Sequence, residues 1–270
     1  MESLKVGIIG GRGQLGGWCA ALFQKRGATV LVADFGTELS NRDVATRADI
    51  VVVSVPIGVT RTVLDEVVEV VRPDQLLVDL TSVKTPFTSM MEKGASEVLS
   101  VHPMFNPHLS VTQDQTCVVC PVRRGDRAHI FEQVLRDEGL RLVSMTPEAH
   151  DRMMAIVQGL THFQAMTAAH CMEALHFKPD ETLQSASPVY RLRLAMIGRI
   201  LAQNPRLYAE IQVYNPFVKG VLEQLRRSNE RLLSLIVAED IEGLVAEFTR
   251  VRDELGGFGE RSVQELVGIV

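Results

Sequence analysis

The chain has 270 residues, of which 46% are hydrophobic and 23% are charged, and its formal net charge is −5. This length suits two modest domains, each with a hydrophobic core of its own. The acidic balance argues against a nucleic-acid-binding protein, which usually carries a basic excess. No apolar run approaches the ~20 residues that span a bilayer, and the start MESLKVGII lacks the basic n-region of a signal peptide. We therefore expect a cytoplasmic protein.

The first half of the chain alternates between short apolar runs and amphipathic segments. Helix-like spacing occurs at 14–27 and 59–71, between runs rich in Val, Leu and Ile. Near-continuous apolar strands alternating with helices are typical of a parallel sheet covered on both faces. We predict an α/β domain over residues 1–146. The strands are expected at 4–9, 29–34, 49–55, 75–80, 98–102, 116–120 and 141–145.

The strand pattern disappears after about residue 147. The remaining segments have helical spacing, and their apolar residues cover more than one face. Such helices pack against a partner subunit as well as against a neighbouring domain. We predict an all-α dimerisation domain over residues 147–270. Its helices are expected at 147–175, 189–204, 216–240 and 246–257.

A glycine-rich stretch, GGRGQLGG, follows the first apolar run and contains the pattern G-x-G-x-x-G. In this pattern the first glycine makes a tight turn, the second admits a pyrophosphate, and the third lets helix and strand pack closely. Because the stretch follows a strand and opens a helix, we predict a Rossmann-type site for a dinucleotide. The residues of the pattern are Gly11, Arg12, Gly13, Gln14, Leu15 and Gly16.

The second predicted strand ends in an acidic residue, Asp34. An acid at this distance from the glycines binds the ribose hydroxyls of NAD and repels the 2′-phosphate of NADP. The predicted cofactor is therefore NAD. The alternative is a flexible glycine-rich turn followed by a surface aspartate.

Three further motifs follow the carboxyl ends of predicted strands, where doubly wound sheets place their ligands. They are SVPIGVT at 54–60, DLTSVK at 79–84 and SVHPMFNP at 100–107. A neutral imidazole at His102 could accept a hydroxyl proton, and Ser82 could orient it. The alternative for His102 is a hydrogen-bonded histidine at the end of a strand. The remaining cofactor contacts are expected from Ser54, Val55, Pro56 and Ser82.

Two cysteines, Cys117 and Cys120, form a C-x-x-C pair, a spacing found in zinc and redox sites. The pair lies in an apolar run with the alternation of a strand, and no second Cys/His pair lies at ligand spacing. Free cysteines usually behave as small buried apolar residues. We expect structural thiols and no metal.

The helical half contributes charged and titratable residues whose roles the pattern leaves open. Arg199 has apolar neighbours, so it needs an anionic partner, either a structural carboxylate or that of a substrate. His162 is either a core histidine or a ligand contact.

The motifs, taken together, resemble the prephenate dehydrogenase family, in particular the dehydrogenase part of the bifunctional enzymes of enteric bacteria. The likeness runs in the same order from residue 10 to residue 211. It is carried by GGRGQLG, VVSVPI, LVDLTSVK, VHPMF, EAHDRMMAIVQGLTHF and SPVYRLRLAMIGRILAQNPRLYAEI. The last two stretches are specific to the family. We expect a stand-alone dehydrogenase that forms a homodimer through its helical domain.

The resemblance implies NAD-dependent oxidative decarboxylation of prephenate to 4-hydroxyphenylpyruvate. By matching positions, His102 would be the catalytic histidine that takes the proton of the ring hydroxyl, and Ser82 would support it. Arg199 would bind the ring carboxylate with support from Arg191. The remaining family positions at or near the substrate pocket are His150, His162 and Tyr208.

Two departures from the family keep other substrates and functions open. Asn106 stands where glycine is expected, and IQVYNPF at 211–217 differs from the serine-rich stretch of the relatives. One alternative is 4-amino-4-deoxyprephenate, whose amine would face His102. Arogenate is a further alternative, which this branch of the family favours less. Outside catalysis, the alternative is a dinucleotide sensor without activity. A β-hydroxyacid dehydrogenase would need a catalytic lysine, and Lys178 and Lys219 lack the K-x-x-x-N pattern.

Overall fold

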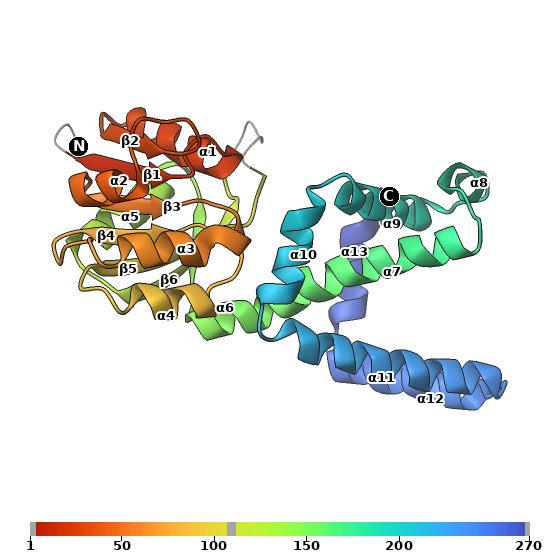
Figure 1. The fold of residues 1–270 in the computed structure, drawn as a ribbon. Coiled ribbons are helices and arrows are strands. Elements are labelled where there is room, and N and C mark those ends of the chain that lie inside the picture. Colours follow the sequence, from red (N-terminus) through yellow and green to blue (C-terminus); the bar gives the residue numbers. More distant parts are fainter. Residues whose placement is uncertain (1–3, 107–111, 268–270) are drawn as a thin grey trace. The chain divides into compact units, whose positions relative to one another are not determined.

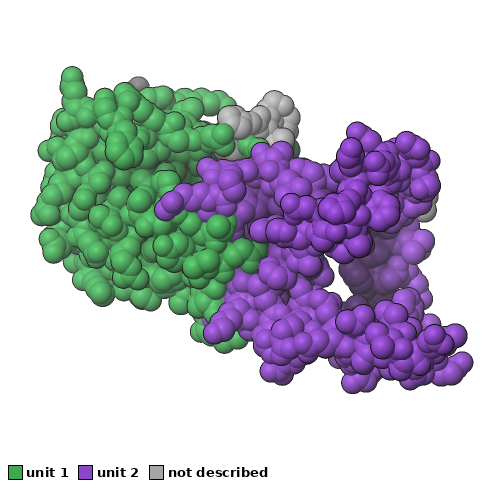
Figure 2. All heavy atoms as spheres, turned by 45° about the vertical axis from the view of Figure 1, so that its right-hand side comes forward, with its two compact units in different colours: residues 1–155, 209–216 green, residues 156–208, 217–270 purple. Residues whose placement is uncertain are grey.

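The computed structural model describes residues 4–106 and 112–267. The chain divides into two compact units, shown in separate colours in Figure 2. The first unit consists of residues 1–155 and 209–216, and the second of residues 156–208 and 217–270. The chain therefore passes between the units three times, whereas the sequence pattern predicts a single division at residue 146.

The first unit is built on a seven-stranded sheet with the order β2-β1-β3-β4-β5-β6-β7. All seven expected strands are present. β1 to β5 run parallel, but β6 pairs antiparallel with β5 and parallel with β7, so the expected all-parallel sheet is wrong at this edge. The strands are β1 (Lys5–Ile9), β2 (Thr29–Ala33), β3 (Ile50–Val53), β4 (Leu76–Asp79), β5 (Glu97–Pro103), β6 (Thr116–Arg123) and β7 (Arg141–Ser144).

Two layers of helices cover the sheet, as Figure 1 shows. Alternate residues of each central strand face opposite layers: Ile50 and Val52 enter one core, and Val51 and Val53 enter the other. All four are fully buried, which explains why these strands read as continuous apolar runs. Helices α1 (Gln14–Gln24) and α5 (Asp126–Asp137) line the first core. Helices α2 (Asn41–Arg47), α3 (Ile57–Val67) and α4 (Thr85–Met91) line the second.

A continuous helical run follows β7, but it is not one regular helix. It consists of α6 (Pro147–Met154), the π-helix η1 (Ala155–Leu160) and α7 (Thr161–Ala174). The chain changes from the first unit to the second at the start of η1, after Ala155. The pattern of apolar residues predicts the helical run but gives no sign of the π-helical turn.

The second unit is entirely helical among the residues that the structure describes. Helices α9, α11 and α12 correspond to the expected segments, whereas α8, α10 and α13 were not predicted. Their bounds are α8 (Pro179–Leu183), α9 (Pro188–Leu201), α10 (Pro205–Tyr214), α11 (Val218–Val237), α12 (Ile241–Leu255) and α13 (Phe258–Val267). The last six residues of α10, from 209 onward, belong to the first unit.

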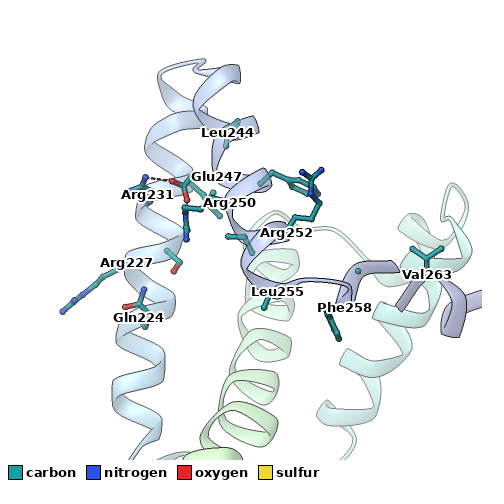
Figure 3. Close-up of a pocket in the computed structure, with 15 residues that line it drawn as sticks. Gln224, Arg227, Arg231, Leu244, Glu247, Arg250, Arg252, Leu255, Phe258 and Val263 are labelled. Atoms are coloured by element: carbon teal, nitrogen blue, oxygen red, sulfur yellow. Dashed lines mark hydrogen bonds and ion pairs between the residues drawn. The ribbon is translucent and has the colours of Figure 1, made fainter. Parts of the chain in front are cut away.

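The second unit buries few apolar side chains of its own. Within its described part these are Ala165, Ile197 and Val218. Many large apolar side chains on its helices are exposed, among them Phe248 and Ile236, which are 75% and 59% exposed. Helices α11, α12 and α13 also enclose a groove of about 1000 Å³, lined by Leu244, Leu255 and Phe258 (Figure 3). Exposed apolar surfaces of this extent are typical of interaction sites. Across the described residues, no helix combines the length and the hydropathy that crossing a bilayer requires.

Candidate active site

The glycine-rich turn between β1 and α1 leaves no room for a side chain at Gly10, Gly11 or Gly16. Gly10 has a φ of +84°, in the left-handed region that glycine adopts without strain. A Cβ atom built at Gly16 would lie 2.2 Å from the Gly10 carbonyl oxygen, and one at Gly11 would lie 2.7 Å from Val32 Cγ1. The turn is therefore a bare backbone cradle at the start of a helix, a geometry that fits the pyrophosphate of a dinucleotide.

The other predicted cofactor residues surround this turn. Asp34 follows β2, and its Oδ2 accepts the Arg12 backbone N–H at 2.8 Å while its Oδ1 accepts that of Phe35 at 2.7 Å. Ser54 follows β3, next to β1, and donates its backbone N–H to Ile9 O at 2.8 Å. The structure brings together, at the carboxyl ends of β1, β2 and β3, all of the residues Gly11, Arg12, Gly13, Gln14, Leu15, Gly16, Asp34, Ser54, Val55 and Pro56.

A chain of buried side chains begins at His102 in β5. His102 Nδ1 lies 2.9 Å from His150 Nε2, and His150 Nδ1 lies 2.8 Å from Asp151 Oδ1. The carboxylate of Asp151 also accepts the backbone N–H groups of Lys84 at 2.9 Å and Thr85 at 2.7 Å. His150 and Asp151 are fully buried, and His102 is 4% exposed. Three elements, β5, α6 and the start of α4, thus meet in one hydrogen-bonded chain.

The order of donors in this chain fixes the state of His102. An ionised carboxylate only accepts hydrogen bonds, so His150 donates from Nδ1 to Asp151. The Nε2 of a neutral His150 then carries the lone pair and accepts from His102 Nδ1. His102 Nε2 is consequently the unprotonated nitrogen of a neutral imidazole. A nitrogen in this state is a proton acceptor.

The direction of each pKa shift agrees with neutral histidines beside an ionised aspartate. Burial lowers the pKa of His102 well below its usual value, and the neighbouring His150 and the Lys84 cation lower it further. Burial also lowers the pKa of His150, against a smaller opposing effect of its hydrogen bond to Asp151. Burial raises the pKa of Asp151, but hydrogen bonds from His150, Thr85 and Lys84 outweigh it and the net shift is downward.

A second buried network adjoins the first through Lys84. Its ammonium group lies 2.8 Å from Asp79 Oδ1 and donates to Val101 O at 2.7 Å, and both charged side chains are fully buried. Ser100 and Thr81 also donate to the Asp79 carboxylate. Paired charges with this many hydrogen bonds avoid the cost of an isolated buried ion. The network fixes the end of β4 and the start of α4, the segment that carries the half-buried Ser82.

Three predicted substrate residues gather in the second unit. The rings of His162 and Tyr208 have centroids 4.3 Å apart and planes inclined by 40°. Burial lowers the pKa of His162 to about 4, and the charge of Arg199 lowers it in the same direction. His162 is 9% exposed, yet its Nδ1 has no hydrogen-bond partner. A buried nitrogen without a partner is costly, so a ligand atom that reaches it would gain a hydrogen bond.

Two predicted substrate residues have other roles in the structure. Both ring nitrogens of His150 bind protein groups, so His150 positions His102 and has no nitrogen left for a substrate. Arg191 donates from Nη2 to Leu183 O at 2.8 Å, which ties α9 to the end of α8. Asn106 is the last described residue before the gap at 107–111 and lies three residues beyond the end of β5.

The cysteine pair is buried in the sheet. Cys117 and Cys120 are free thiols in β6, and burial raises the pKa of each to about 12. Thiols held protonated in this way are poor metal ligands and poor nucleophiles. Among the described residues, no three side chains of the His, Cys, Asp and Glu types are grouped in a way that could hold a metal ion.

Several residues of the buried networks were not predicted as site residues. Asp79 and Ser100 are the first residues of the motifs DLTSVK and SVHPMFNP, but neither was assigned a role; each is a polar residue inside a buried strand. Lys84 ends the motif DLTSVK and Asp151 lies in EAHDRMMAIVQGLTHF, but the motifs assign neither residue a role. Glu210 and Asn215 lie in the segment 209–216: Glu210 Oε2 accepts the Gly58 N–H at 3.1 Å, and Asn215 donates to Asp151 O at 2.8 Å.

Fold and site together define a dinucleotide-type α/β unit joined to a helical unit. The nucleotide-binding domain of prephenate dehydrogenases matches residues 24–143, and the dimerization domain of these enzymes matches residues 146–250. The chain belongs to the prephenate dehydrogenase family, an oxidoreductase family. The resemblance noted in the sequence and the predicted fold class are both confirmed.

Individual relatives give the same family. A probable arogenate/prephenate dehydrogenase of Methanocaldococcus jannaschii is 34% identical over 96% of this chain, and the chain spans 63% of that relative's length. The T-protein of Haemophilus influenzae is 31% identical, with 97% and 70% of the two chains covered. A 4-amino-4-deoxyprephenate dehydrogenase of Streptomyces pristinaespiralis is 28% identical over 78% of this chain and 72% of its own.

A solved structure shares the fold. The crystal structure of prephenate dehydrogenase from Aquifex aeolicus in complex with hydroxyphenyl propionate and NAD+ superimposes with a TM-score of 0.71. It is 21% identical, and the match covers 94% of this chain and 98% of the other. A nucleotide-binding domain and a fold neighbour that holds NAD+ agree with the expected cofactor.

Proposed function

We propose that this protein is an NAD-dependent dehydrogenase that converts prephenate to 4-hydroxyphenylpyruvate and carbon dioxide. The observation that carries the proposal is the buried chain His102–His150–Asp151, which presents an unprotonated Nε2 at the carboxyl end of the sheet. The reaction needs a group that accepts a hydroxyl proton, and a neutral buried imidazole in a fixed tautomer supplies it.

The cradle of Gly11, Gly13 and Gly16 would hold the pyrophosphate of the cofactor, and Asp34 would accept hydrogen bonds from its ribose hydroxyls. When bound, NAD supplies the hydride acceptor of the reaction. Because these glycines have no side chains, the pyrophosphate could approach the backbone of the turn closely.

The protein's own part in the reaction is to orient the ring and to hold one proton. His102 Nε2 takes the proton of the C4 hydroxyl as hydride leaves C4 for the cofactor. The bond between C1 and its carboxylate then breaks and carbon dioxide leaves. The electron pair of the broken bond stays with the ring and makes it aromatic. The proton returns from His102 to the phenolic oxygen, so no net proton is released. Ser82, in the segment between β4 and α4, is assigned to orient the hydroxyl.

Recognition of the substrate's carboxylates is assigned to the second unit. Arg199 offers a guanidinium group suited to bidentate binding of a carboxylate. His162 offers its unpartnered Nδ1, and Tyr208 stacks against the histidine ring. The low pKa of His162 keeps it neutral, so the positive charge for the carboxylate comes from Arg199.

The proposal is tested by mixing purified protein and NAD+ with prephenate, arogenate or 4-amino-4-deoxyprephenate and following NADH formation. We expect a higher kcat/KM with prephenate than with 4-amino-4-deoxyprephenate, because His102 is held as a base for a hydroxyl proton that the amine lacks. A preference for arogenate, which carries the same ring hydroxyl, would move the assignment to that substrate. A strong preference for the amine would move the assignment to 4-amino-4-deoxyprephenate, the alternative that Asn106 raises. Absence of NADH with all three substrates would overturn the proposal and favour a dinucleotide sensor.

We also infer that the protein is a homodimer formed through its helical unit. The described part of that unit buries three apolar side chains and exposes many, and the matched domain is named for dimerization. A second copy of the chain would cover the exposed apolar side chains, and the stabilisation scales with the apolar area removed from water.

A further inference from the structure

We propose that Arg12 is a latent ligand for a 2′-phosphate group and that Asp34 beside it keeps the site selective for NAD. The inference rests on the proposed nucleotide site and concerns which of two cofactors that site accepts. It assigns a function to the side chain of Arg12, which the glycine pattern itself does not require.

The Arg12 guanidinium is anchored at the same strand end as the Asp34 carboxylate. Arg12 Nη1 donates to Phe35 O at 2.7 Å, and its backbone N–H donates to Asp34 Oδ2 at 2.8 Å. The next residue, Gly36, has a φ of +71°, and a Cβ atom built on it would lie 3.5 Å from Arg12 Nη1. The turn therefore has no side chain at Gly36 that covers the guanidinium, and Arg12 is exposed.

The two side chains select for opposite ligands. A carboxylate has about four lone-pair positions, and Asp34 uses two of them for the backbone N–H groups of Arg12 and Phe35. The remaining positions suit the hydroxyls of a ribose. A 2′-phosphate brings negative charge to this carboxylate and is repelled. The same phosphate is attracted by a guanidinium, whose remaining N–H donors match phosphate oxygens.

The pairing of a carboxylate with a guanidinium at one strand end makes a specific prediction. Arg12 should contribute little to NAD+ binding and should partly offset the repulsion of NADP+. When the negative charge of Asp34 is removed, the attraction between Arg12 and the 2′-phosphate is no longer opposed. NADP+ should then bind as well as NAD+ or better.

The test measures binding of NAD+ and NADP+ by isothermal titration calorimetry, without substrate, so that catalysis plays no part. The two ligands differ only by the 2′-phosphate. For the unmodified protein we expect NAD+ to bind at least about 10-fold more tightly than NADP+, the change that corresponds to about 1.4 kcal/mol. In Arg12→Gln we expect NADP+ to weaken by about a further 10-fold and NAD+ to change by less than about 2-fold.

A second pair of variants tests the role of Asp34. In Asp34→Asn we expect the NADP+/NAD+ affinity ratio to rise at least about 10-fold, and in Asp34→Asn combined with Arg12→Gln this gain should disappear. The matched control is Arg42→Gln, which removes an exposed arginine of α2 that lies 3.8 Å from Glu69. This control should leave both affinities unchanged.

Failure of this inference can be distinguished from failure of the proposed nucleotide site. The inference is overturned if Arg12→Gln weakens both ligands equally, or if the gain of Asp34→Asn survives in the double variant. The Arg12→Gln result decides even if Asp34→Asn does not fold, because glutamine keeps the backbone N–H that binds Asp34. If the unmodified protein binds neither ligand, the proposed nucleotide site is itself wrong.

Discussion

His102 combines three properties of a general base: it is buried, its Nδ1 is engaged, and its pKa is lowered. We expect His102→Asn to reduce kcat with prephenate by about 10²–10⁴-fold, the usual contribution of a positioned acid or base. Binding of NAD+ should not change, because the cofactor contacts lie on other residues. Steady-state kinetics and calorimetry measure the two quantities.

The control for this variant is His129→Asn, an exposed histidine of α5 whose Nδ1 contacts Gly125 O at 2.8 Å. It should retain full activity. If His102→Asn also retained full activity, His102 could not be the base.

His150 should act through His102 alone. Phenylalanine at position 150 keeps an aromatic ring in the buried space but removes the acceptor for His102 Nδ1. Without that acceptor the His102 proton can occupy either nitrogen, and we expect kcat to fall at least about 10-fold with little change in KM. Imidazole ¹⁵N chemical shifts should report a mixture of His102 tautomers in His150→Phe and a single one in the parent. An unchanged tautomer with reduced kcat would show that the loss has another cause.

The buried histidines His102, His150 and His162 make the free energy of unfolding depend on pH in a defined direction. Their pKa values in the folded protein lie below the 6.5 of an exposed histidine. Between the two values the unfolded chain binds more protons than the folded one. The free energy of unfolding should therefore be fully retained above about pH 6.5 and should fall as the pH drops below it.

Urea unfolding followed at several pH values measures this dependence. The loss of stability between neutral and mildly acidic pH should be smaller in His150→Phe than in the parent, because one of the contributing histidines is absent. Parallel curves for the two proteins would contradict the assignment of these protons.

At the level of single elements, the turn from β1 to α1 offers a matched pair of glycines. Gly16→Ala places a Cβ atom 2.2 Å from the Gly10 carbonyl oxygen, so the cradle must shift. Gly17→Ala places a Cβ atom 3.6 Å from Gly11 O, an ordinary contact, and alanine is the better helix former. We expect Gly16→Ala to weaken NAD+ binding by about 100-fold or more and Gly17→Ala to leave it within about 3-fold. Equal binding by the two variants would rule out the close approach as the function of Gly16.

The strands, the glycine turn and the acid at Asp34 could all be predicted because each depends on local sequence. Buried strands read as apolar runs, and a turn with a left-handed residue favours glycine. The reversal of β6 could not be predicted, because its apolar run is the same in either direction. The His102–His150–Asp151 chain joins residues 48 positions apart, and only the fold shows that His150 contacts His102.

For the whole molecule, the exposed apolar side chains of the helical unit predict an oligomer. We expect size-exclusion chromatography with light scattering to give twice the mass of the 29.8 kDa chain. Phe248→Glu places a charge on a side chain that is 75% exposed in the single chain and lines the groove formed by α11, α12 and α13. This variant should shift the equilibrium toward monomer, because burying an unpaired charge in an interface costs several kcal/mol.

The control is Val59→Glu, the same chemical change at a 45%-exposed position of α3 in the first unit. It should leave the mass unchanged. A parent protein that is monomeric at all concentrations would contradict the homodimer.

The segment 209–216 has a consequence for cutting or exchanging parts of this chain. Its residues complete the nucleotide-binding unit from a distant point of the sequence: Ile211 is 3% exposed within the core beside α3 and α4, and Asn215 binds the Asp151 carbonyl. A gene fragment that stopped at residue 155 would leave that core open and would remove the Glu210 carboxylate from the Gly58 N–H. Protease nicking between residues 156 and 208 should yield fragments that stay associated, because the segment 209–216 contacts the first unit. The first unit therefore needs residues from both sides of the segment 156–208, so a cut at residue 155 does not separate two independently folding units.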